Sequence, residues 1–302
     1  KRGAARGGAL LLELLLAMAA PAYSALAAVV EALGKQESAL QIPPAARAEP
    51  NMDAVDLLNL LSEASPSVSQ AVTVGECATT MCAVCHEPTQ RRMKATSIAV
   101  DVAAPKQLAL HGALRYACEA DQFGDEANPV YECTETCKQM QSATRRLHPC
   151  APWPARLFIV LRRYTLDFNA VGVKKVMHRV AFPSKLDLAA LCDAPLGSPN
   201  PPEYHLVGAV VHTGSSTQSG VYNYEKSHEA LAAIGLDDAQ VPQDVPCPGG
   251  ATPYILVYAC DTDGGDTGLD APAGDHLAAT PKPAATADDT PRQQSRGCCA
   301  VM

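Results

Sequence analysis

The hydrophobic pattern at the start of the chain is that of helices. Residues 9–35 are rich in Ala and Leu and predict two helices broken near Pro21, whose ring would end the first of them. Basic residues, an apolar run and small residues at the very start also fit a secretory signal peptide, but Glu13 interrupts the apolar run. We therefore interpret this region as a buried helical segment, followed by a loop at residues 41–50.

A clearer amphipathic pattern follows at residues 51–64. Apolar side chains cluster on one side of the predicted helix, and Asn51 or Asp53 stands where a side chain can cap its first turn. These apolar residues are Val55, Leu57, Leu58, Leu60 and Leu61. The first 65 residues are therefore expected to be helical.

From Val72 onward the pattern becomes that of strands. Between residues 72 and 150, short β-rich runs alternate with turns around one helix expected at 108–118. After residue 155 the runs are longer and more apolar, as in buried strands. We predict strands at 155–166, 178–188 (where a turn follows), 204–214, 221–226 and 252–260.

The composition changes again at the C-terminal end. Residues 260–302 are rich in Asp, Gly, Pro, Thr and Ala and contain almost no large apolar side chain. Such a segment cannot bury enough surface to offset its ordering entropy, so we expect it to be disordered. It ends in Cys-Ala-Val-Met, which is a CaaX box, so Cys299 would be farnesylated. Cys298 beside it would be palmitoylated. The alternative is that the motif arises by chance in an Ala-rich tail.

The net charge and the cysteine usage indicate which partners and which cellular location to expect. The formal net charge of −8 argues against a nucleic-acid partner. The 12 cysteines are irregularly spaced and no Asn-x-Ser/Thr sequon occurs, which points to a reducing, cytoplasmic location. Together with the CaaX box, this predicts a cytoplasmic protein that associates with a membrane through its C-terminal lipid.

Two cysteine pairs, a C-x-x-C and a C-x-x-x-C, have the spacing of metal-binding turns; they are Cys82, Cys85, Cys133 and Cys137. Two such turns side by side can hold Zn²⁺ with four thiolates, which leaves no position for water or substrate, so the predicted zinc is structural. The alternative is a pair of ordinary β-turns with reduced cysteines. Cys77, Cys118 or Cys150 could replace a ligand, whereas His86 is expected to be a turn residue.

Taken in order, these motifs resemble the catalytic domain of the ubiquitin-specific proteases (USPs). The resemblance is strongest in the segments "ARLFIVLRRY", "VAFPSKLDL", "YHLVGAVVHTGSS", "SGVYNY", "GLDDAQV" and "PYILVY". The two cysteine pairs stand where the family has its zinc knuckles. Residues 51–61 are similar to the family's Gln-Asp-Ala-x-Glu-Phe-Leu helix. The opening "AARGGALLLELLLAMAAPAYSAL" is similar to the helix that begins at the family's catalytic Cys, so the resemblance covers about residues 1–259.

The resemblance implies an α+β fold of the papain-like cysteine protease type. It implies a helical thumb at about 1–70, zinc-ribbon β fingers at 71–150 and a β palm at 151–259, with the tail at 260–302 outside the domain. It also implies a ubiquitin-binding surface on fingers and palm, with the ubiquitin tail between thumb and palm. In the family's reaction a Cys thiolate attacks the carbonyl of ubiquitin's last glycine, a His activates the Cys, and an Asp or Asn orients the His.

Two of these three catalytic positions depart from the family. Val221 stands where the family has the His of Gly-His-Tyr, and the catalytic Cys of the family falls at or near Ala5. Asp237 retains the position of the orienting residue. His228, expected in the turn after the strand at 221–226, follows too far along the chain to be a convincing substitute. His212 is expected to be a hydrogen-bonded structural residue.

The expected function is therefore that of a catalytically inactive, ubiquitin-binding or scaffold member of the ubiquitin pathway. The expected partners are ubiquitin or ubiquitinated proteins. The alternative is an active ubiquitin thiolesterase whose Cys box is missing from a truncated N-terminus. An isopropyl group cannot accept a proton, and the loss of a general base alone costs about 10²- to 10⁴-fold in rate.

Overall fold

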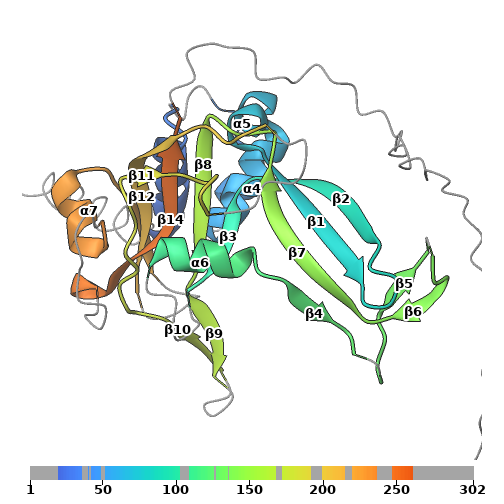
Figure 1. The fold of residues 1–302 in the computed structure, drawn as a ribbon. Helices are drawn as coiled ribbons and strands as arrows, with labels where there is room; N and C mark the ends of the chain where they lie inside the picture. Colours follow the sequence, from blue (N-terminus) through green and yellow to red (C-terminus); the bar gives the residue numbers. More distant parts are fainter. Residues whose placement is uncertain are drawn as a thin grey trace, which may run out of the picture. The chain divides into compact units, whose positions relative to one another are not determined.

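The computed structural model describes residues 20–35, 40, 42–48, 52–102, 109–125, 127–134, 136–167, 172–191, 199–214, 220–236 and 247–260. All of them belong to one compact unit, Lys1–Thr267. They form an α+β fold with a helical thumb, a finger sheet and a larger palm sheet (Figure 1). Within these ranges, no helix combines the length and the apolar character that crossing a bilayer requires.

The described part of the thumb contains four helices: α2 (Ala20–Ala32), α3 (Pro44–Ala48), α4 (Ala54–Ala64) and α5 (Pro66–Val72). Pro21 lies in the first turn of α2, where proline is tolerated because the first N–H groups of a helix have no intrahelical partner. Residues 9–19, where the first of the two predicted helices was expected, lie outside the described residues. The loop predicted at 41–50 contains α3, so that prediction was wrong for part of the segment. The amphipathic helix after Asp53 is confirmed as α4.

The finger sheet is antiparallel with the strand order β2-β1-β7-β4. Its strands are β1 (Val74–Cys82), β2 (Pro88–Ala95), β7 (Ala143–Cys150) and β4 (Asp121–Phe123). A separate hairpin joins β5 (Tyr131–Cys133) to β6 (Gln139–Gln141) and lies close to the end of the finger sheet (Figure 1).

The palm sheet has the order β11-β12-β14-β8-β3, with β13 paired to β12. Its strands are β3 (Ile98–Asp101), β8 (Arg156–Arg162), β11 (Lys185–Leu186), β12 (Tyr204–Thr213), β13 (Val221–Glu225) and β14 (Ala251–Ala259). The remaining elements are α6 (Leu110–Ala117), α7 (His228–Ile234), the pair β9 (Tyr164–Asp167) and β10 (Gly172–Lys175), and the short helix η2 (Pro248–Gly250). The palm strands and the helix expected at 108–118 are thus largely confirmed.

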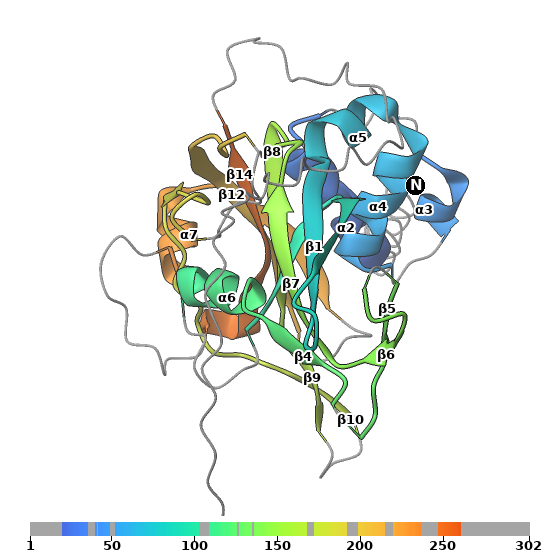
Figure 2. The ribbon, with the colours of Figure 1, turned by 45° about the vertical axis from the view of Figure 1, so that its right-hand side comes forward.

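Both faces of the palm sheet are covered. Since successive side chains of a strand point to opposite faces, Phe158 and Val160 pack under α2 and α4, whereas Leu157, Ile159 and Leu161 pack with α6 and α7. Figure 2 shows the thumb helices and α6 on opposite sides of β8. The long apolar run of β8 follows from this double burial.

The strand predicted at 155–166 is divided at Arg163, which is fully buried. Its guanidinium donates to the carbonyl oxygens of Pro253 (2.6 Å), His178 (2.9 Å) and Val176 (3.2 Å). Burial lowers the pKa of Arg163 to about 10, so the side chain keeps its charge at neutral pH. These hydrogen bonds join β8, β14 and the segment after β10, and the chain turns here into β9.

Candidate functional site

Val221, which the resemblance places at the family's histidine position, lies at the start of β13. Val221 pairs with Thr213 at the end of β12, and 42% of its side chain is exposed. The exposed isopropyl group offers neither a proton acceptor nor a hydrogen-bond partner. The preceding Gly220 lies against the ring of His212, where a Cβ atom would overlap Nε2, so only glycine fits there.

His212 is the imidazole next to this position, and it is buried. Its Nδ1 lies 2.8 Å from Nζ of Lys175 and 3.3 Å from the hydroxyl of Tyr164. A lysine ammonium only donates, so Nδ1 of His212 is the acceptor and the neutral ring carries its proton on Nε2. Burial, assisted by the charge of Lys175, lowers the pKa of His212 to about 4. The ring is therefore neutral at pH 7, with its basic nitrogen engaged inside the protein.

Lys175 holds this arrangement in place. Besides Nδ1 of His212, its Nζ donates to the carbonyl oxygens of His212 (3.0 Å) and Gly214 (2.7 Å), which uses all three N–H groups. Burial and the nearby Arg163 lower the pKa of Lys175 to about 8, so it remains mostly charged at pH 7. The expectation that His212 is a structural, hydrogen-bonded residue agrees with these contacts.

Asp53 joins the thumb to the palm beside the same position. Its Oδ1 accepts from the backbone N–H of Val55 (2.8 Å) and caps α4, while its Oδ2 accepts from the hydroxyls of Tyr222 and Tyr254, each at 2.9 Å. Burial, together with the Asp53 charge, raises the pKa of both tyrosines. Asp53 thus ties α4 to β13 and β14 through a carboxylate that two neutral phenols bind.

An aromatic cluster completes this part of the molecule. The rings of Tyr222 and His212 lie 4.8 Å apart with a tilt of 50°, and Tyr254 meets Tyr222 at 5.9 Å and Tyr164 edge-on at 6.4 Å. The sequence suggested Asp53 only as a helix cap. The signal that could have revealed its palm contacts is the alternation of side chains in β13 and β14, which points Tyr222 and Tyr254 toward the thumb.

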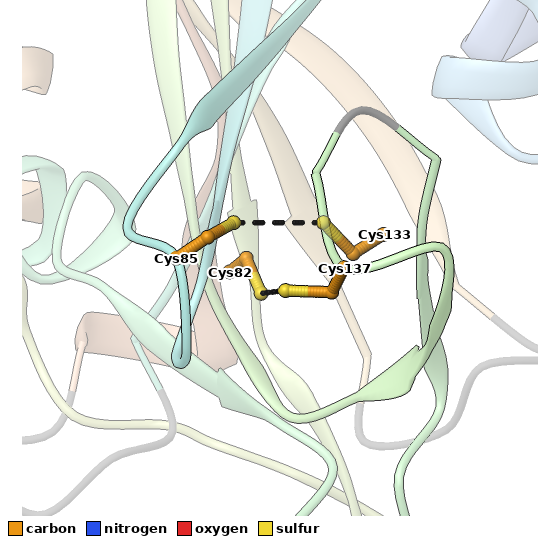
Figure 3. Close-up of side chains that lie close together, drawn as sticks. All are labelled: Cys82, Cys85, Cys133 and Cys137. Atoms are coloured by element: carbon orange, nitrogen blue, oxygen red, sulfur yellow. Dashed lines mark hydrogen bonds between the residues drawn. The ribbon is translucent and has the colours of Figure 1, made fainter.

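The four predicted metal ligands come together where the finger sheet meets the β5–β6 hairpin (Figure 3). Sγ of Cys82 lies 3.9 Å from that of Cys137, and Sγ of Cys85 lies 3.6 Å from that of Cys133. A regular tetrahedron with Zn–S bonds of about 2.3 Å has S–S edges of about 3.8 Å, so the cluster has the size of a zinc site. All four sulfur atoms lie within 4.8 Å of one another.

The electrostatics of the cluster also suit a cation. Backbone N–H groups of Cys137 and Thr136 lower the pKa of Cys133 to about 6, which favours the thiolate that binds zinc. Desolvation and the neighbouring sulfur atoms raise the pKa of Cys137 to about 12. Four thiolates this close repel one another, and a divalent cation between them supplies the charge that lets all four ionise.

The other cysteines considered as ligands lie elsewhere. Cys77 and Cys150 are buried in β1 and β7, and Cys118 ends α6. Among the described His, Cys, Asp and Glu side chains, the four knuckle cysteines are the one group compact enough to hold an ion. His86 has a positive φ of 58° and donates its N–H to the carbonyl of Cys82 (3.0 Å), as expected for a turn residue.

Other predicted site residues fall outside this geometry. Ala5, Asp237, Cys298 and Cys299 lie outside the described residues. His228 is exposed at the first position of α7, after the Ser227 cap, and was expected in a turn.

A cavity of about 710 Å³ lies at the junction of fingers and palm. Its walls come from the finger strands β1, β4 and β7, from the edge of the palm at β3 and β8, and from α6. They combine apolar groups such as Phe123 and Tyr116 with the charged side chains of Asp101, Arg162 and Glu76. Burial raises the pKa of Glu76, and the nearby Arg162 opposes this shift.

A helical thumb, a finger sheet ending in a four-cysteine cluster and a palm that carries the Gly-x-Tyr strand together define the architecture of a ubiquitin-specific protease. A family model described as ubiquitin carboxyl-terminal hydrolase matches residues 28–258. The chain belongs to this family, and its fold is the papain-like α+β fold of the USP type.

Individual relatives agree with this assignment. Mouse ubiquitin carboxyl-terminal hydrolase 17-like protein C is 33% identical over 147 residues, which cover 48% of this chain and 25% of that protein. Probable ubiquitin carboxyl-terminal hydrolase 16 of Schizosaccharomyces pombe is 28% identical over 179 residues, 59% of this chain and 36% of that protein. Human ubiquitin carboxyl-terminal hydrolase 35 is 30% identical over 114 residues, 37% of this chain and 10% of that protein. The matches thus span only a minor part of these longer relatives.

Proposed function

We propose that this chain binds ubiquitin or ubiquitinated proteins without hydrolysing them. The observation that supports this is Val221 at the exposed start of β13, where the family presents its general base. The neighbouring His212 does not compensate, because its Nδ1 accepts from Lys175 and its pKa of about 4 makes it a poor proton acceptor. This reasoning does not depend on which residue occupies the nucleophile position.

The cavity between fingers and palm is a candidate surface for this binding. It combines apolar and charged groups, which is the composition of a recognition surface. Phe123 is 40% exposed on β4 and is the large apolar side chain most accessible at its finger wall. We expect ubiquitin to contact this wall, in line with the family's surface on fingers and palm.

Zinc is proposed as the resident ion of the four-cysteine cluster. Its role would be structural, since four protein thiolates fill a tetrahedral site and leave no open position. It would fix the β5–β6 hairpin to the end of β1 and so shape the finger side of the ubiquitin surface.

Two measurements on the full-length protein test the proposal. A ubiquitin probe with a C-terminal electrophile should give no covalent adduct, while a titration with unmodified ubiquitin should show binding. Phe123→Ala should weaken that binding about tenfold, as for a buried interface anchor, whereas Val173→Ala, which truncates an exposed side chain on β10, should not. Covalent capture would favour the alternative of an active thiolesterase.

A further inference from the structure

The edge of the finger sheet opposite β4 is formed by β2, and no described strand pairs with its outer side (Figure 1). The β5–β6 hairpin approaches only the start of β2, where the hydroxyls of Tyr131 and Thr89 lie 3.0 Å apart. The strand is paired to β1 without a register shift, from Pro88 opposite Met81 to Ala95 opposite Val74. A strand of this length presents a row of backbone N–H and C=O groups to a possible further strand.

Two backbone hydrogen bonds at the ends of the strands show which residues of β2 direct their N–H and C=O groups away from β1. The N–H of Cys82 donates to the carbonyl of Glu87 (3.4 Å), and the N–H of Gly75 donates to that of Pro152 (3.0 Å). Even-numbered residues of β1 therefore direct their backbone groups toward β2, and odd-numbered ones toward β7. In an antiparallel pair, two residues that lie opposite each other either exchange both backbone hydrogen bonds or form none with each other.

The outward backbone groups of β2 thus belong to Gln90, Arg92 and Lys94, because their partners in β1 are odd-numbered. Pro88, whose nitrogen carries no hydrogen, falls in the same outward set, as is usual for proline on an edge strand. The free edge therefore carries cationic side chains on residues whose backbone is also available.

The side chains of Arg92 and Lys94 lie on one face of the sheet, together with Arg146 across β1. All three are exposed, and none forms an ion pair with another described residue. The opposite face of the sheet carries Glu76 and Phe123, which line the cavity between fingers and palm. Arg92, Lys94 and Arg146 are therefore not among the residues that line the surface assigned to ubiquitin.

We propose that the β2 edge binds an extended acidic segment of a partner protein as a fifth strand of the finger sheet. Acidic residues at every second position of that segment would face Arg92 and Lys94. Opposite charges across neighbouring strands are stabilising, and backbone hydrogen bonds would supply the rest of the affinity. This interaction is additional to the proposed ubiquitin binding and leaves that surface free.

A peptide fits this edge better than a nucleic acid does. The edge presents donors and acceptors in alternation, whereas a phosphate backbone only accepts. The described part of the cationic face contains no Phe, Tyr or Trp on which bases could stack. Its residues in β1, β2, β4 and β7 are Gly75, Cys77, Thr79, Met81, Pro88, Gln90, Arg92, Lys94, Gln122, Thr144, Arg146, His148 and Cys150. The competing explanation is that the charges only guard the edge against aggregation.

Charge reversal tests the side-chain part of the proposal. The probe is a labelled synthetic peptide of about ten residues with Glu at alternate positions, compared with a peptide of the same composition whose Glu residues are clustered. The alternating peptide should bind more tightly, and Arg92→Glu with Lys94→Glu should weaken its binding about tenfold or more. The matched control reverses two exposed cations elsewhere, Arg115 on α6 and Lys174 on β10, and should leave the affinity unchanged.

A proline tests the backbone part. Gln90→Pro removes one outward N–H without touching the charges or the β1–β2 ladder, so the melting temperature should stay constant while peptide affinity falls several-fold. Ubiquitin affinity should be unaffected in every variant. The proposal is overturned if neither peptide binds, if Gln90→Pro binds normally, if the control reversal weakens binding equally, or if a polyuridine RNA is bound in preference to the peptide.

Discussion

Val221 is an exposed residue whose side chain ends in two methyl groups. Among the described residues, the only imidazole beside it is that of His212, which is buried and hydrogen-bonded within the protein. The geometry explains why proximity does not make His212 a base: Lys175 donates to Nδ1, and Gly220 lies against Nε2. A ring held in this way contributes to the fold through hydrogen bonds and packing, and it has no free nitrogen to offer to a substrate.

Val221→His should restore the family's residue without restoring the reaction. The position is exposed, so the variant should fold normally. Because the resemblance places Ala5 at or near the nucleophile position, we expect the new imidazole to have no thiol to activate. We expect no covalent adduct with the ubiquitin electrophile probe. An adduct with this single variant would reveal a nucleophile that the alignment at Ala5 misses.

His212 should make the protein sensitive to mild acid. Because its folded-state pKa lies near 4, below the ordinary value of 6.5, the unfolded chain takes up the proton first as the pH falls. The stability contributed by neutral His212 is thus fully present above pH 6.5 and is lost toward pH 4. Denaturant melts at steps between these values should show this decline.

The matching control separates His212 from other titrating groups. His212→Gln should flatten the decline between pH 6.5 and 4, although the variant is less stable overall. His205→Gln, which removes a partly exposed imidazole from the same strand, should keep the wild-type slope. An unchanged slope in His212→Gln would contradict the assignment.

At the level of elements, the fingers should depend on the metal. Cys133→Ser removes one of the four ligands, and we expect it to abolish stoichiometric zinc in native mass spectrometry and to expose the β5–β6 amides to hydrogen exchange. Cys118→Ser lies outside the cluster and should retain zinc. Amides of β12 and β14 in the palm should stay protected in both variants, because their pairing does not involve the hairpin.

Elements with strong periodicity could be predicted from the sequence, and elements shaped by tertiary contacts could not. The helix α4 and the strands β12 and β14 carry regular apolar patterns and lie where they were expected. A strand pattern does not predict that Arg163 points inward and donates to three carbonyl groups, because those carbonyl groups belong to β14 and to the segment after β10.

The same division holds for the candidate site. Cysteine spacing was sufficient to predict the four-thiol group, since the chemistry is carried by residue type and local turns. The tie between Asp53 and the two tyrosines spans 169 and 201 positions of sequence, and no local signal predicts a contact of that separation. The position of Val221 could be read only through the resemblance to a family.

At the level of the whole molecule, Asp53 couples thumb and palm. Asp53→Ala removes a helix cap, worth about 1 kcal/mol, and two hydrogen bonds from tyrosines to a carboxylate, so we expect a loss of about 3 kcal/mol in the free energy of unfolding. Asp53→Asn keeps the cap and should lose about half as much. Denaturant unfolding followed by tyrosine fluorescence measures both; an Asp53→Asn variant as stable as the wild type would mean that the tyrosine contacts contribute nothing.

The position of Tyr222 has an evolutionary consequence. The residue next to Val221 is kept by the fold itself, because its hydroxyl anchors α4 and its ring packs on His212. Selection for folding alone would therefore preserve the surroundings of an active site long after the reaction had been lost. Intact neighbours of an active-site position are therefore no measure of activity, which depends on the identity of the reacting atoms.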